Sequence, residues 1–248
     1  FIFLIIYITE EAPMSPLPLF SVLHQVILLS IILFWMIIPL IGKNMSKENA
    51  KNVAFRLAFL IIFLEIYLFI YRQSIGIFDP SRHIPIHLCS FAEFCAAYAL
   101  VSKNQRAFEL AFFWSFAGSI QALLTPNLSG YSLFDTEFII FFISHGLIIL
   151  NVIWLLYVDK MKIRSISLLE TFIATNLLLI PIGLIDWLGN ANYMYLRYKP
   201  PVNNPFLIGE WPWYILGFEA VAIIFFSILF IIMKICGKVK PPSSTVFA

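Results

Sequence analysis

Residues 137–158 read EFIIFFISHGLIILNVIWLLYV, and this stretch decides the class of fold. At 1.5 Å per helical residue it is long enough to cross the hydrocarbon core of a bilayer, which is about 30 Å thick. Backbone groups in lipid must hydrogen-bond within their own segment, so we expect a helix rather than a strand. Further apolar runs of this kind lie at 18–41, 53–71, 85–102, 107–124, 166–187 and 212–234. The sequence therefore predicts an all-α, polytopic transmembrane bundle of about seven helices.

The composition agrees with this fold class. Of the 248 residues, 61% are hydrophobic and only 12% are charged. A soluble domain of this size cannot cover so much apolar surface with so few charges. We expect one transmembrane domain at 18–235, preceded by a segment at 1–17 that is either interfacial or truncated and followed by a cytoplasmic tail at 236–248. Membrane lipids are the expected partners and nucleic acid is not; the oligomeric state stays open.

The positive charges predict the orientation of the bundle. Twelve of the sixteen lysines and arginines fall at one end of the predicted helices, and Arg72, Arg82, Arg197 and Lys199 fall at the other. Cytoplasmic loops carry an excess of lysine and arginine. The sequence thus predicts an N-terminus outside and a C-terminus in the cytoplasm.

Polar residues inside the predicted membrane region gather in its outer half. All of the histidines lie there, namely His24, His83, His87 and His145. Gln121, Asn192 and Tyr193 lie at the same level, and polar groups inside a membrane usually line a cavity or a pathway. We expect an outward-facing cavity in which His24, His87, Gln121, Asn192 and Tyr193 bind substrate. The histidines lack the paired spacing of a zinc site, so no metal and no cofactor is expected.

The most unusual part of this half is Arg82–Ser90, which reads RHIPIHLCS. Pro85 suits the first position of the predicted helix 85–102, where a missing N–H costs nothing. Cys89 then falls near the positive end of the helix dipole, a setting that favours thiolate. His87 and Cys89 lie about 200° apart on a helix and cannot pair directly, so a base for Cys89 must come from another helix, with His145 and His24 as candidates. The alternative is that Cys89 is a small packing residue.

Intramembrane acids support a competing interpretation. Glu65, Glu93 and Glu219 each need a partner or a proton in the membrane. A proton-coupled transporter uses such acids along its pathway, so a seven-helix transporter remains an alternative, as does a non-catalytic membrane protein with a polar binding cavity.

Several strings resemble those of one family of membrane proteins. IPIHLCS at 84–90, FELAFFWSFAGSIQALLTPNL at 108–128, SHGLIILN at 144–151, GNANYMYLRYKPP at 189–201 and EWPWYILGFE at 210–219 are similar to the bacterial YwaF-like integral membrane proteins. Their eukaryotic relatives are similar to transmembrane protein 164. The resemblance covers about residues 20 to 235 and implies a location in the bacterial cytoplasmic membrane.

The resemblance also implies an activity. The eukaryotic relatives look like lipid acyltransferases that work through an acylated cysteine, and the cysteine and histidine of their motifs match Cys89 and His145. Carried over, Cys89 attacks a phospholipid ester and His145 serves as general base and then acid. Backbone N–H groups at the start of the helix 85–102, or Gln121 and Asn192, would stabilise the oxyanion. The expected function is a Cys/His-dependent lipid acyltransferase or acyl hydrolase acting near the outer face.

Overall fold

The computed structural model describes residues 7–8, 17–128, 131–200, 202–203 and 209–240. Most of the predicted N-terminal segment 1–17 and the last part of the predicted tail, 241–248, lie outside the described residues. The domain limits drawn from the sequence therefore stay predictions.

The regular secondary structure of the described chain is helical apart from four strands of two residues each. The helices are α1 (Val22–Lys43), α2 (Lys47–Ser74), α3 (Pro80–His83), α4 (Leu88–Ser102), α5 (Gln105–Trp114), the π-helix η1 (Ser115–Ser119), α6 (Ile120–Leu124), α7 (Thr136–Tyr157), α8 (Ser167–Gly189), the 3-10 helix η2 (Tyr193–Tyr195) and α9 (Trp213–Ile235). The strands β1 (Tyr7–Ile8) and β3 (Val202–Asn203) pair antiparallel, and β2 (Ile163–Arg164) pairs parallel with β4 (Val239–Lys240). The all-α fold class is confirmed.

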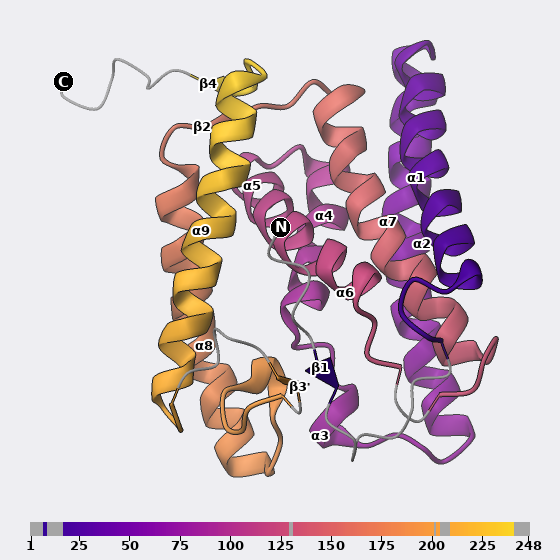
Figure 1. The fold of residues 1–248 in the computed structure, drawn as a ribbon. Helices are drawn as coiled ribbons and strands as arrows, with labels where there is room; N and C mark the ends of the chain where they lie inside the picture. Colours follow the sequence, from indigo (N-terminus) through magenta and orange to yellow (C-terminus); the bar gives the residue numbers. More distant parts are fainter. Residues whose placement is uncertain (1–6, 9–16, 129–130, 201, 204–208, 241–248) are drawn as a thin grey trace.

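The helices form a bundle with a central and a peripheral part. In Figure 1, α4, α5 and α6 lie in the middle, α1, α2 and α7 on one side, and α8 and α9 on the other. Large aromatic side chains such as Phe108, Phe113 and Trp154 are buried on α5 and α7. By contrast, α1, α8 and α9 expose long rows of large apolar side chains on their outer faces. Exposed apolar rows on this scale belong in lipid, as expected for a polytopic membrane protein.

Six helices are long and apolar enough to cross a membrane, namely α1, α2, the continuous helix Gln105–Leu124, α7, α8 and α9. The seventh predicted span, 85–102, contains the shorter apolar helix α4 of 15 residues. Fifteen residues cover about 22 Å, less than the hydrocarbon thickness of about 30 Å. By itself, α4 is therefore too short to span the hydrocarbon core, and the described chain has six helices of spanning length rather than the predicted seven.

The helix α4 begins at Leu88, so the prediction that Pro85 occupies its first position is wrong. Ile84 is extended, as residues before proline tend to be, and His87 is the N-cap. The Tyr193 hydroxyl accepts a hydrogen bond from the Ile84 N–H at 3.0 Å. This contact comes from a loop more than a hundred residues away, and it holds the segment before α4 outside the helix.

Candidate functional site

Cys89 lies in the first turn of α4, where backbone N–H groups have no helical partner. The N-cap residue, His87, makes no side-chain capping bond to them. Because the helix begins at Leu88 rather than at Pro85, Cys89 is closer to the helix end than the sequence suggested. The thiol therefore lies beside donors and a positive dipole end that can stabilise developing negative charge.

The π-helix η1 faces this turn. A β-carbon built on Gly118 would lie 3.6 Å from the Cys89 sulfur, so the glycine brings its backbone close to the thiol. The Cys89 thiol and the Ser119 hydroxyl are near enough to interact. Ser119 is completely buried, yet its Oγ has no partner of good hydrogen-bond geometry in the described part of the chain. π-helical turns inside α-helices are frequent at functional sites, and buried polar groups without partners are rare in proteins.

His145 lies on α7, which packs against both α4 and η1. Its Nδ1 is 2.8 Å from the carbonyl oxygen of Phe141, one turn earlier. A carbonyl only accepts, so Nδ1 carries the hydrogen in the neutral ring and the lone pair is on Nε2. His145 also interacts electrostatically with His87, which is two residues from Cys89. This tautomer is the one that a general base acting through Nε2 requires. We refer to Cys89 and Ser119, together with His145 on the adjoining helix α7, as the Cys89 site.

Glu93 is one turn further along α4 and is almost fully buried. Its Oε1 has no hydrogen-bond partner among the described residues. It interacts electrostatically with Cys89 and with Glu65 of α2. Glu65 in turn is near Arg72, which binds Glu137 through two hydrogen bonds of 2.7 Å. The first two acids of the predicted transport pathway thus lie near each other.

The third acid, Glu219, lies elsewhere. Its Oε2 accepts a hydrogen bond of 3.0 Å from Asn176, which joins α9 to α8. In Figure 1 these helices are on the opposite side of the bundle from α2. The three acids of the transporter interpretation therefore do not form one cluster.

Among the predicted substrate-binding residues, His24 forms hydrogen bonds to the protein backbone. Its ring is completely buried. Nδ1 accepts a hydrogen bond from the Phe20 N–H at 3.0 Å, and Nε2 is 2.9 Å from the Leu123 carbonyl oxygen. Both ring nitrogens are satisfied, so His24 joins the start of α1 to the end of α6. It is therefore not available as the base for Cys89 in this conformation.

Asn192 and Tyr193 organise the loop between α8 and α9. The Asn192 side chain makes three hydrogen bonds of 2.9–3.0 Å to the backbone of Arg197 and Tyr198. The Tyr193 hydroxyl donates to the Pro80 carbonyl at 2.6 Å and accepts from Ile84. These bonds hold the loop against α3 and the segment before α4. The structure thus gives both residues a positioning role.

The side chains of His87 and Gln121 are less engaged. Both residues are exposed, and in the described part of the chain neither side chain makes a hydrogen bond. The His87 ring packs on the Tyr193 ring with centroids 4.9 Å apart. Of the predicted binding residues, these two are the ones left free to meet a ligand.

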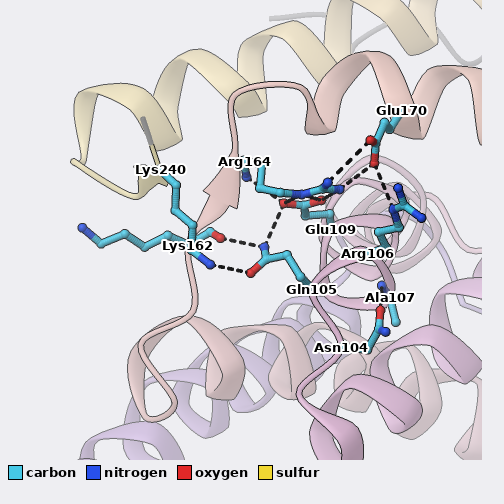
Figure 2. Close-up of polar contacts among 9 residues, drawn as sticks. All are labelled: Asn104, Gln105, Arg106, Ala107, Glu109, Lys162, Arg164, Glu170 and Lys240. Carbon is cyan, nitrogen blue, oxygen red and sulfur yellow. Dashed lines mark hydrogen bonds and ion pairs between the residues drawn. The ribbon is translucent and has the colours of Figure 1, made fainter. Parts of the chain in front are cut away.

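The sequence did not predict a second polar cluster, which lies at the other end of the bundle and is drawn in Figure 2. Arg164 contacts Glu109 at 2.6 Å and Glu170 at 2.5 Å, and Arg106 approaches Glu170 at 3.5 Å. We call these four residues the Arg164 cluster. Hydrogen bonds that the Arg164 guanidinium donates to Glu109 raise the pKa of Arg164 above its usual value, so the guanidinium stays charged. The cluster could have been predicted from the positions of Glu109 and Glu170, which lie near helix ends on the arginine-rich side.

No group of three or more His, Cys, Asp or Glu side chains that could hold a metal ion occurs among the described residues. His83, the remaining histidine, uses its Nδ1 to accept a hydrogen bond of 2.8 Å from the Asp79 N–H. Burial lowers the pKa of His83, so its neutral form is favoured.

Comparison with known proteins identifies the family of the chain. No curated protein and no solved structure matches the chain significantly. The family model described as the TMEM164 family matches residues 15–230, which include every helix that carries the Cys89 site. The match covers most of the 248 residues, and the chain therefore belongs to the TMEM164 family.

Proposed function

We propose that this membrane protein is a lipid acyltransferase, or a related acyl hydrolase, in which Cys89 is the nucleophile and His145 the general base. The observation that carries the proposal is the hydrogen bond from His145 to the Phe141 carbonyl, which leaves the Nε2 lone pair for proton transfer. Membership of the TMEM164 family supports it, because the resemblance of the motifs implies an acylated cysteine at Cys89.

The reaction would proceed in two steps. The Cys89 sulfur attacks the carbonyl carbon of a phospholipid ester while His145 Nε2 takes the thiol proton. The ester C–O bond breaks, His145 returns the proton to the leaving oxygen, and a lysolipid departs from the Cys89 thioester. A hydroxyl of an acceptor lipid, or water in a hydrolase, then attacks the thioester as His145 takes its proton. Cys89 leaves and is reprotonated by His145.

The first turn of α4 supplies the electrostatic part of the proposal. In each step, negative charge develops on the carbonyl oxygen, and free N–H groups at a helix start stabilise such charge. The close backbone of Gly118 and the unpartnered Ser119 hydroxyl are further groups at the thiol. His87 and Gln121 are proposed to contact the lipid headgroup.

The proposal includes the membrane and the orientation. We place the chain with the bacterial YwaF-like members, in the cytoplasmic membrane, with Cys89 toward the outer face. The support is the charge distribution, since the Arg164 cluster and most of the lysines lie at the end opposite to α3.

The test is acyl labelling of the purified protein with an alkyne-bearing phospholipid, followed by detection of label that hydroxylamine releases. Cys89→Ser is expected to lose all hydroxylamine-sensitive label. His145→Gln is expected to be labelled at least 100-fold more slowly. Cys95→Ser, in the same helix, is the matched control and should label normally. Normal labelling of Cys89→Ser would exclude the thioester mechanism.

The transporter alternative rests on the proximity of Glu65 and Glu93. It predicts that Glu93→Gln abolishes proton-coupled uptake in proteoliposomes while Cys89→Ser leaves uptake intact. The acyltransferase proposal predicts instead that acyl transfer is lost in Cys89→Ser.

A further inference from the structure

A groove of about 450 Å³ lies between the helices α8 and α9, away from the Cys89 site. Leu196, Arg197 and Trp211, from the segment between these helices, also line it. Its walls are mainly apolar and include Ile180, Gly183, Trp187, Leu196, Trp211 and Ile215. Trp187 and Trp211 are both more than half exposed. Tryptophans in this position are typical of the level where acyl chains meet headgroups.

Arg197 provides a positive charge at this groove. Its Nη1 donates to the Asn190 side chain at 2.6 Å and to the Asp186 carbonyl at 3.4 Å. Its guanidinium lies 5.6 Å from the Trp187 ring centre and 5.0 Å from that of Tyr198. Within the described residues, no carboxylate lies at ion-pair distance from Arg197, although the Asp186 carboxylate interacts with it electrostatically, and Nε and Nη2 make no hydrogen bond. A fixed guanidinium with two free donors suits a phosphate oxygen pair.

Asp186 provides an acceptor in the same groove. The Tyr193 N–H donates to its Oδ1 at 2.8 Å. Its Oδ2 is buried and has no hydrogen-bond partner among the described residues, and the residue is only 1% exposed. An unpaired buried carboxylate oxygen is costly, so a ligand donor would stabilise it. A headgroup that carries an ammonium or a hydroxyl supplies such a donor, whereas choline does not.

We propose that this groove binds one glycerophospholipid. An acyl chain lies between α8 and α9, the phosphodiester contacts Arg197, and a donor of the headgroup contacts Asp186. The apolar cluster of Ile182, Ala191 and Tyr193 packs against Leu196 of the groove and against Ile86 and Phe91 near the start of α4. No residue of the Cys89 site lines the groove, so the lipid site is distinct from the proposed acyl-transfer site.

The experiment is native mass spectrometry of the purified full chain, delipidated in detergent and titrated with defined lipids. We expect one tightly bound lipid, with phosphatidylethanolamine and phosphatidylglycerol retained at least tenfold better than phosphatidylcholine. Arg197→Gln should lower retention of all three lipids at least tenfold. Arg82→Gln removes the same charge from an exposed residue at the same end and should not change retention.

Further variants test the groove itself. Gly183→Leu fills it with a side chain and should abolish retention, while Gly189→Leu, in open space at the end of the same helix, should not. Asp186→Asn keeps the Oδ1 acceptor and should remove the preference over phosphatidylcholine. Cys89→Ser should retain lipid normally, which separates this site from the acyl-transfer proposal. Equal retention by Arg197→Gln, Gly183→Leu and their controls would overturn the lipid site.

Discussion

The Arg164 cluster and the Cys89 site contain buried polar groups at opposite ends of the bundle, and they differ in how these groups are satisfied. In the Arg164 cluster each charged group meets an opposite charge, and Gln105 adds a bond of 2.8 Å to Glu109. At the Cys89 site the Ser119 hydroxyl has no hydrogen-bond partner of good geometry in the described chain, and the neighbouring Glu93 Oε1 has no hydrogen-bond partner there. A saturated network stabilises a fold, whereas buried polar groups without partners are rare in proteins and can serve a ligand instead.

The largest loss of stability is expected from Arg164→Gln. Loss of the guanidinium leaves the buried Glu109 without its counter-charge, and removal of one partner of such a pair costs about 3 kcal/mol in free energy of unfolding. Arg106→Gln is the matched control, because Arg106 is mostly exposed and touches Glu170 only at 3.5 Å. The control should change stability by less than about 1 kcal/mol. Unfolding in detergent measures both, and equal stability of the two variants would show that the cluster is not structural.

An intermediate loss of stability is expected from His24→Ala. This substitution leaves the buried carbonyl of Leu123 and the N–H of Phe20 without their partners, at a cost of about 1–3 kcal/mol. His87→Ala, an exposed ring at the same end, should change stability by less than about 0.5 kcal/mol. We expect folded His24→Ala protein to keep its acyl labelling. A loss of labelling at unchanged stability would instead return His24 to the substrate site.

The smallest effect on stability is expected from Ser119→Ala, because its hydroxyl makes no hydrogen bond of good geometry. We expect a change within about 0.5 kcal/mol, while labelling of Cys89 falls about tenfold because a polar neighbour of the thiol is lost. Ser115→Ala in the same π-helix is the control. The Ser115 hydroxyl bonds the Phe112 carbonyl at 3.3 Å, so this variant should lose stability and keep labelling. If Ser119→Ala lost stability and kept labelling while Ser115→Ala did the reverse, the distinction between hydrogen-bonded and unpartnered groups would be wrong.

Hydropathy located the helices well because each long span needs only its own residues to be apolar. It failed at α4, where the contact of Ile84 with Tyr193 delays the helix to Leu88. It also did not predict the π-helix at Ser115–Ser119, since an extra residue in a turn leaves the apolar pattern of 107–124 unchanged. The roles of His24 and Asn192 were equally hidden, because a satisfied and a free polar side chain look the same in a sequence.

The sequence by itself determined that this protein is an all-α membrane bundle, because the cost of exposing apolar spans to water does not depend on which neighbour covers them. It also singled out Cys89 and His145 as the residues to test. Only the tertiary structure decided which polar groups are saturated: Glu109 meets Arg164 across 55 residues, and His24 meets Leu123 across 99. Hydrogen bonds and ion pairs are short-ranged and directional, so their partners are fixed by packing and not by the order of residues along the chain.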